Sequence, residues 1–225
     1  MADFGIAKID QSKLREEVYK ALHDAFTRGE FGPGAVLNLR ALADQLGTSM
    51  TPVREAVRRL VAEGALVDTP SRTLEVPQFD IDRMLDLKRA RLALETMVLD
   101  IAIDEMDDAA ISLLDDVLNA APGAVVDGPD LRKNYDFHFL LYHKSGSQVM
   151  LPLIRSLWLQ YGAYLNLIIR QKGASEVDEH EHHLQIIDAL RERDRTAARA
   201  ALTADIERSF HLISVEPNAA SGGAL

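Results

Sequence analysis

Two short helical patterns separated by a turn occupy Leu39 to Gly64, which read LRALADQLGTSMTPVREAVRRLVAEG. Asn38, just before this stretch, is suited to cap the first helix because its side chain can accept from free backbone N–H groups. Gly47 is suited to end that helix, since glycine adopts the left-handed conformation found after many helices. The sequence therefore predicts a helix of about two turns over 39–46.

The second pattern begins at Thr51 and Pro52. Thr51 can act as an N-cap, and Pro52 fits the first helical position, where no N–H is needed. The helix is expected to run to about Glu63 and to end at Gly64. Its apolar residues recur at the spacing of one helical face, and they are Val53, Ala56, Val57, Leu60 and Val61.

The segments on either side complete a known arrangement. Upstream, apolar residues at helical spacing predict one further helix through Leu14, Val18, Leu22 and Phe26. Downstream, 65–68 and 73–76 have the composition of two short strands around a Thr-Pro-Ser-Arg turn. Helix, helix, turn, helix and hairpin is the order of a winged helix-turn-helix with a small β-hairpin wing.

The remainder of the chain predicts an antiparallel α-helical bundle. Its periodic segments are about 80–104, 107–120, 129–145, 147–171, 176–192 and 194–213. We therefore expect a mainly α protein with a flexible N-terminal tail (1–11), a winged helix-turn-helix domain (12–77), an all-helical domain (78–215) and a flexible C-terminal tail (216–225).

Composition narrows the class of protein. The 225 residues include no cysteine, which excludes disulfides and thiolate chemistry, and the net charge is −10. Most of this acidity falls after residue 78, because residues 1–78 carry 10 basic and 11 acidic side chains. The sequence shows neither a long apolar run nor a signal-peptide pattern, so we expect a cytoplasmic protein that does not contact membranes.

Two arginines mark the helix over 52–63 as a candidate DNA-reading helix. Arg54 and Arg58 are four residues apart and share the face opposite the apolar stripe. Arginines on such a helix can reach guanine edges or phosphates in the major groove. Arg40 and Arg72 would flank this helix and contact the DNA backbone or the minor groove. The alternative is an ordinary solvated helix.

The sequence resembles a known family at several of these positions. LADQLG, TPVREAVRRL and GALV in the first part resemble the winged-helix domain of GntR-type transcription regulators. RLALE (91–95), Phe137-His138 and HLQIIDAL (183–190) resemble the FCD ligand-binding domain of the FadR subfamily. Six bundle helices are similar to its VanR-like branch.

The resemblance implies that residues 12–77 form a DNA-binding domain and residues 78–215 an effector-binding and dimerisation domain. It also implies a homodimer that binds a palindromic double-stranded DNA operator. The predicted contacts are Arg40, Ser49, Thr51, Arg54, Arg58 and Arg72. Two departures from the family pattern bear on the operator sequence. Met50 stands where the family usually has arginine, and Thr73 stands where the wing usually has glycine.

The resemblance also implies a divalent metal in the helical domain. The matching positions are Asn134, His138, His183 and Asp205, with Asp205 in place of the usual histidine. Such a mixed nitrogen and oxygen set suits Zn, Ni, Mn or Fe. Two alternatives stay open. His180 lies three residues before His183 and could be the ligand instead, or the same residues could bind an effector without metal.

Arg91 is the predicted effector-binding residue. It could take the carboxylate of a small organic acid bidentately, or it could form an ordinary i,i+4 ion pair with Glu95. Further cavity candidates are Tyr135, Trp158, Tyr161 and Arg170. We expect a repressor controlled by such an acid, and not an enzyme. The alternatives are a metal-dependent helical-bundle enzyme that uses His138, His183 and Asp205, or a sensor of the metal ion itself.

Overall fold

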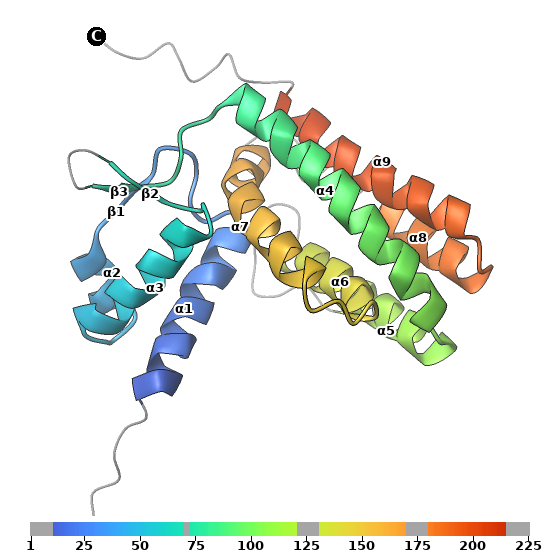
Figure 1. Ribbon diagram of the computed structural model, residues 1–225, viewed down its shortest axis with the longest axis horizontal. Coiled ribbons are helices and arrows are strands. Elements are labelled where there is room, and N and C mark those ends of the chain that lie inside the picture. Colours follow the sequence, from blue (N-terminus) through green and yellow to red (C-terminus); the bar gives the residue numbers. More distant parts are fainter. Residues whose placement is uncertain (1–10, 70–72, 121–130, 170–179, 215–225) are drawn as a thin grey trace, which may run out of the picture.

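The computed structural model describes residues 11–69, 73–120, 131–169 and 180–214, which form two parts (Figure 1). A small unit of helices and a three-stranded sheet comes first along the chain. Long helices make up the rest of the described chain and pack on one another. The mainly α class and the winged helix-turn-helix followed by a helical bundle are therefore confirmed.

Helix α1 (Gln11–Thr27) supports the small unit from one side. Its predicted stripe is buried at Val18, Leu22 and Phe26, where it packs against the apolar face of the following helices. Helix α2 (Leu39–Gln45) begins as predicted, because Oδ1 of Asn38 accepts hydrogen bonds from two backbone N–H groups in its first turn.

Helix α3 (Met50–Ala62) begins earlier than predicted. Ser49 is its N-cap residue, so Thr51 and Pro52 lie in the first turn rather than at the cap and the first position. Proline is tolerated there because the first backbone N–H groups of a helix have no partner within it. The predicted end is confirmed, since Gly64 follows the helix with φ of +78°.

The sheet contains a strand that the sequence did not predict. Its strands are β1 (Val36–Leu37), β2 (Val67–Asp68) and β3 (Leu74–Glu75), in the antiparallel order β1-β3-β2. The hairpin of β2 and β3 was predicted. β1 was missed because only two residues pair, and the partner, Glu75, lies far along the chain from Val36.

The bundle helices lie within a few residues of the predicted ranges. They are α4 (Ile81–Ala102), the 3₁₀ turn η1 (Ile103–Glu105), α5 (Asp108–Asn119), α6 (Leu131–His143), α7 (Met150–Ile169), α8 (Glu181–Arg191) and α9 (Arg195–Ser214). Across the described residues, no helix combines the length and the apolar character needed to cross a membrane.

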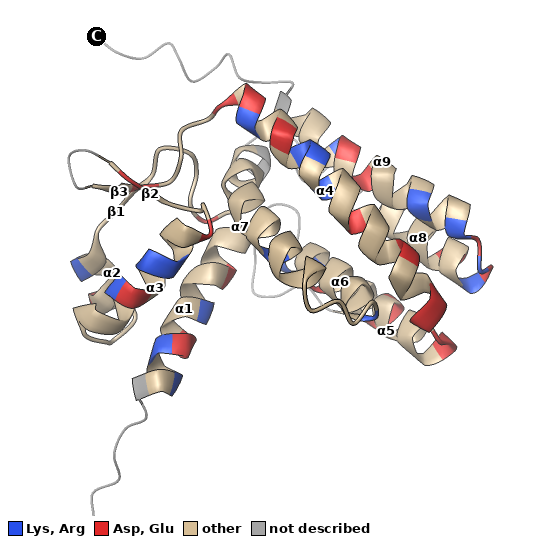
Figure 2. Cartoon of the chain, viewed as in Figure 1, with Lys and Arg blue, Asp and Glu red and all other residues tan. Residues whose placement is uncertain are grey.

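Helix α7 belongs to both parts of the molecule. Leu159 and Ala163 pack into the core of the small unit, whereas Trp158 and Tyr161 pack into the core of the bundle. Both faces can be apolar because α7 carries only one charged residue, Arg155 (Figure 2). The core of the small unit therefore continues into the bundle through this helix.

Polar contacts fix the same junction at the helix ends. Ser156 Oγ and Gln160 Nε2 both donate to the backbone carbonyl of Glu63, at 3.0 and 3.1 Å. Asn166 Nδ2 donates to the carbonyl of Gly29 at 2.5 Å. These carbonyls lie where α3 and α1 end and would otherwise lack partners. Side chains of α7 thus hold the ends of two helices of the small unit.

Candidate functional site

The outer face of α3 presents two arginines without ion-pair partners. Arg54 and Arg58 are exposed, while Val53 and Val57 on the opposite face are buried. Within the described part of the chain, neither guanidinium is paired with a carboxylate, in contrast to Arg59, which contacts Glu16 and Glu63. Unpaired cations on one exposed helix face remain available for phosphates or base edges.

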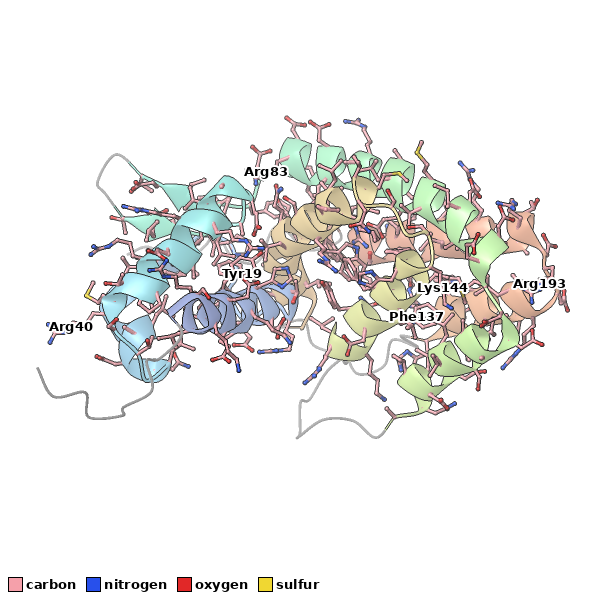
Figure 3. All side chains as sticks on the ribbon, turned by 60° about the horizontal axis from the view of Figure 1, so that its bottom comes forward. Tyr19, Arg40, Arg83, Phe137, Lys144 and Arg193 are labelled. Atoms are coloured by element: carbon pink, nitrogen blue, oxygen red, sulfur yellow. The ribbon has the colours of Figure 1, made fainter. Side chains whose placement is uncertain are left out.

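The other predicted DNA contacts lie at the same end of the unit. Arg40 is exposed in the first turn of α2 and points away from the bundle (Figure 3). Ser49 and Thr51 are exposed at the start of α3, as is Met50 between them. Arg72 lies outside the described residues. Five of the six predicted residues are therefore exposed on α2, on α3 and in the turn between these helices.

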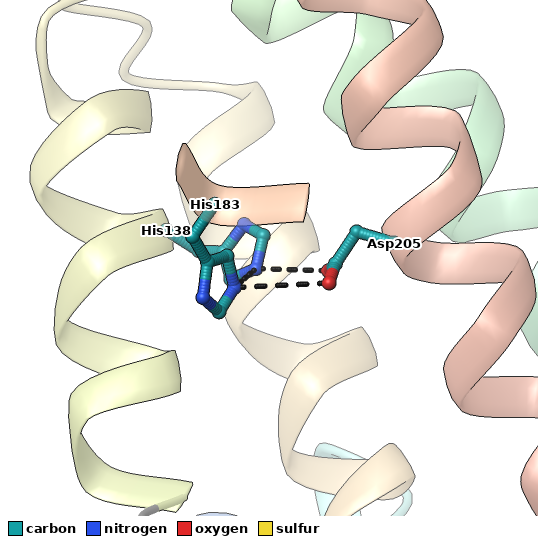
Figure 4. Close-up of side chains that lie close together, drawn as sticks. All are labelled: His138, His183 and Asp205. Atoms are coloured by element: carbon teal, nitrogen blue, oxygen red, sulfur yellow. Dashed lines mark hydrogen bonds and ion pairs between the residues drawn. The ribbon is translucent and has the colours of Figure 1, made fainter. Parts of the chain in front are cut away.

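Three predicted metal ligands meet in the bundle although they come from three helices. His138 lies on α6, His183 on α8 and Asp205 on α9 (Figure 4). Nε2 of His138 is 3.2 Å from Nε2 of His183 and 3.2 Å from Oδ2 of Asp205, and Nε2 of His183 is 3.7 Å from Oδ1. All three residues are buried.

Hydrogen bonds on the far side of His138 set its tautomer. The Tyr142 hydroxyl donates to Oε2 of Glu95 at 2.6 Å, which uses its only proton. Nδ1 of His138, 3.0 Å from the same hydroxyl oxygen, must therefore carry a proton and donate it. Nε2 of His138 is left with a lone pair that faces His183 and Asp205.

The electrostatics of the cluster favour neutral imidazole beside a charged carboxylate. Burial is the main influence on His183 and lowers the pKa of its imidazole to about 3. Burial alone would raise the pKa of Asp205, but the neighbouring imidazoles and the guanidinium of Arg208, whose Nη2 lies 3.5 Å from Oδ1, lower that pKa below its usual value. A neutral histidine and an ionised carboxylate are the forms that bind metal ions.

The residues present fit a divalent metal ion. Ligand atoms that each lie 2.0–2.2 Å from one ion are separated by about 3.0–3.5 Å, close to the distances between the three ligand atoms. Neutral His183 can donate from Nε2 to Nε2 of His138, 3.2 Å away, or can carry its proton on Nδ1 and offer a second imidazole lone pair to a cation beside Asp205. The cluster can therefore hold a metal through two nitrogens and one or two oxygens.

Two further residues, Asn134 and His180, bear on the predicted set of metal ligands. Asn134 is half-buried one turn before His138 on α6, and its amide makes no hydrogen bond among the described residues. His180 lies behind His183, with its Nδ1 3.4 Å from Nδ1 of that residue. His183, rather than His180, faces His138 and Asp205.

Arg91 forms the ion pair with Glu95 and also faces the bundle core. Its Nε and Nη2 donate to the two carboxylate oxygens of Glu95 at 2.6 and 3.2 Å. The guanidinium lies over Trp158 and Tyr161, at 4.3 and 4.4 Å from their ring centroids. Nη1 of Arg91 and Nε1 of Trp158 are buried without an acceptor in the described residues. Arg170, a further candidate, lies outside those residues.

Sequence reasoning missed the chain of contacts that joins these two groups. Glu95 accepts from Arg91 and from Tyr142, and Tyr142 contacts His138, so the arginine and the metal cluster share one buried network. Tyr142 follows His138 by four residues on α6, a spacing that could have pointed to this contact. Tyr135 lies apart from Arg91, in an edge-to-face contact with Trp158.

Comparisons with known proteins agree with this geometry. The family model of the bacterial regulatory proteins of the gntR family matches residues 14–76, and the FCD domain model matches residues 86–208. The HTH-type transcriptional regulator McbR of Escherichia coli (strain K12) is 28% identical over 219 residues, covering 95% of this chain and 99% of that protein. The solved structure of E. coli McbR/YncC has a TM-score of 0.82 at 27% identity, covering 92% of this chain and 98% of that one.

Two further relatives are also regulators. The Nta operon transcriptional regulator of Aminobacter aminovorans is 29% identical over 187 residues, covering 81% of this chain and 86% of that protein. The HTH-type transcriptional repressor GlaR of E. coli (strain K12) is 27% identical over 191 residues, covering 80% and 86%. The named relatives are transcriptional regulators and not enzymes, so the enzyme alternative is set aside. The chain belongs to the GntR family of bacterial transcriptional regulators and carries an FCD effector-binding domain after its helix-turn-helix unit.

Proposed function

We propose that the protein is a homodimeric repressor that releases its operator when a small organic acid binds beside a divalent metal in the helical domain. The observation that carries this proposal is the meeting of His138, His183 and Asp205 as buried lone-pair donors. We assign the protein to the FadR subfamily and its VanR-like branch, which the helices α4 to α9 support. The printed name of the relative GlaR, a repressor, supports the repressor role.

The metal would be held by Asn134, His138, His183 and Asp205. When bound, it would supply a Lewis-acid contact for an oxygen of the effector. Tyr142 orients His138 through Nδ1, and the ring of Phe137, 4.5 Å from the His183 ring, packs against the second imidazole. Supporting contacts of this kind hold ligand side chains in position and increase metal affinity.

The effector would use donors that have no protein acceptor. Nη1 of Arg91 and Nε1 of Trp158 are both buried, and an unsatisfied buried donor costs free energy. Trp158 packs on the Arg91 guanidinium and also on the His138 ring, with centroids 5.1 Å apart. A carboxylate between these groups and the metal would satisfy both donors, which favours an organic acid as effector.

Binding would reach the DNA-reading unit through α7. Trp158 lies at the effector site, and the neighbouring Leu159 lies in the core of the small unit. An effector that prefers one position of α7 would therefore favour one position of the attached α3. Arg40, Ser49, Thr51, Arg54 and Arg58 would then meet the operator, together with Arg72 from the wing.

Exposed apolar side chains support a homodimer. Met97 on α4 is 53% exposed, and Val149, just before α7, is 72% exposed. Ile101 and Leu153 are exposed on the same two helices, which pack against each other. Exposed large apolar side chains on neighbouring helices favour association. A second copy there would supply the second recognition helix that a palindromic operator needs.

The metal is tested first, by elemental analysis of protein purified without an affinity tag or chelator. We expect about one equivalent of a transition metal in the wild type and none in His183→Ala. His182→Ala is the matched control, because His182 is the adjacent histidine and hydrogen-bonds Gln185 instead of the cluster. Equal metal content in all three proteins would contradict the assigned site.

The regulatory role is tested with an operator selected from random DNA. Metal-loaded protein should bind it as a dimer and lose affinity when an aliphatic di- or tricarboxylate is added. Loss of the response after chelation, with DNA binding retained, would support an acid that acts beside the metal. If chelation alone changes operator affinity and no acid does, the ion itself is the signal.

A further inference from the structure

A cleft lies between the DNA-reading unit and the bundle, and none of the predicted metal ligands lines it. It has a volume of about 740 Å³ and is bordered by α1 and the end of α3 on one side and by α6 and α7 on the other. Figure 1 shows these elements at the junction of the two parts. Because its walls come from both parts, anything that fills the cleft contacts both.

One wall of the cleft is aromatic. Tyr135 stacks on Phe139 along α6, with ring centroids 4.2 Å apart and an interplanar angle of 26°. His23 from α1 meets Tyr135 edge to face at 6.2 Å, and Tyr19 lies one turn before His23. All four side chains line the cleft. Such a wall suits a planar ring, which can stack or meet these rings edge-on.

Most of the charges that line the cleft neutralise one another. Arg59 pairs with Glu16 and Glu63, and Arg132 pairs with Asp136. Lys20 and Arg155 differ, because within the described residues neither has a carboxylate partner, and of these two cations Arg155 is the one that also lies over the aromatic wall. Its Nη2 lies 3.0 Å from Nε2 of His143, which accepts the hydrogen bond.

His143 holds Arg155 in place without cancelling its charge. Burial, followed by the charge of Arg155, lowers the pKa of the His143 imidazole, so the ring is neutral at physiological pH. The guanidinium also lies over the Phe139 ring, 5.9 Å from its centroid. A guanidinium that is held in place without a carboxylate partner, beside an aromatic wall, can bind a ligand that carries an anionic group on an aromatic ring.

We propose that this cleft is a second ligand site that binds a small aromatic carboxylate, with its ring against His23 and Tyr135 and its carboxylate paired with Arg155. The occupied cleft joins α1 to α6 and α7, so the ligand stabilises one arrangement of the two parts. Tyr135 and Phe139 each pack on Trp158, at 5.6 and 5.7 Å. Trp158 contacts His138 and Arg91, so the cleft lies one aromatic layer from the metal cluster.

The test is calorimetric titration of the full chain with benzoate, and with benzamide as the uncharged ligand of the same shape. We expect benzoate to bind at least tenfold more tightly than benzamide. Arg155→Gln should weaken benzoate binding at least tenfold, and Arg155→Lys should recover part of the affinity. Arg89→Gln, which removes an exposed arginine of α4, is the control and should bind benzoate as the wild type does.

The same titration after chelation separates the cleft from the buried cluster. Benzoate affinity should be unchanged in chelator-treated protein, because no predicted metal ligand lines the cleft. Benzoate binding that disappears with the metal and is unaffected by Arg155→Gln would place the ligand at the cluster and overturn the proposal. Absence of benzoate binding by the wild type would overturn it as well, and this second result would not bear on metal binding or operator release.

Discussion

The hydroxyl oxygen of Tyr142 lies 3.0 Å from Nδ1 of His138, on the side of the imidazole that faces away from Asp205. Burial raises the pKa of the Tyr142 phenol well above its usual value. The negative charge of Glu95 and the hydrogen bond with Glu95 raise this pKa further. The phenol therefore keeps its proton and donates it to Glu95. The consequence for His138 is a proton on Nδ1 and a free lone pair on Nε2.

Removal of this hydroxyl should weaken metal binding without removing a ligand. In Tyr142→Phe, nothing fixes the tautomer of His138, so we expect the affinity for the metal to fall by about 10–100-fold. Competition with a chromophoric chelator measures this change. Tyr164→Phe is the matched control, because Tyr164 is a buried tyrosine outside the network that packs against Phe79. Equal affinities in the two variants would contradict the orienting role of Tyr142.

Arg54 offers the sharpest test of the DNA-reading face. Arg54→Ala removes an exposed guanidinium that pairs with no described carboxylate, so the fold should be unaffected. We expect a loss of about 1–3 kcal/mol in specific operator binding, measured by fluorescence anisotropy at fixed salt.

Arg89→Ala makes the same change in net charge on α4, in the bundle, and should leave operator affinity unchanged. An equal loss in both variants would mean that only the total charge matters. It would contradict a specific contact by Arg54.

The fold was predictable because its signals are local. The Asn38 cap, the Gly64 stop and the apolar stripe of α3 each act over a few neighbouring residues. The start of α3 was wrong by two residues because Pro52 is compatible with several positions of a first helical turn. Strand β1 was missed because its pairing with β3 is a contact between distant residues.

In the candidate site, the sequence could predict only those residues that occupy positions of a family motif. His138, His183 and Asp205 were named in this way, and the structure brings them together. The network through Glu95 and Tyr142 was not named, because it depends on how α4 packs against α6. The cleft beside Arg155 has no local signal, since its walls are far apart in sequence.

Gly162 should be essential to the junction between the two parts. A Cβ at this position would overlap the carbonyl oxygen of Phe26, which is backbone and cannot turn aside. An alanine in place of an exposed helical glycine stabilises a protein by about 0.5–1 kcal/mol. Here we expect the opposite sign, with a lower Tm for Gly162→Ala and faster proteolysis between β3 and α4. An unchanged or higher Tm would contradict the close contact of α7 with α1.

His23 should make the stability of this junction sensitive to acid. Burial lowers the pKa of its imidazole below the usual value of 6.5. The carboxylates of Asp24 and Glu63 raise this pKa but do not outweigh burial, and the charge of Arg155 lowers it slightly further. The unfolded chain therefore takes up a proton at higher pH than the folded chain does. The stability from neutral His23 is present above about pH 6.5 and is lost as the pH falls toward the lowered pKa of the folded state. Thermal unfolding between pH 8 and 5 should show a smaller fall in Tm for His23→Gln than for the wild type, whereas parallel curves would mean that this imidazole keeps an ordinary pKa.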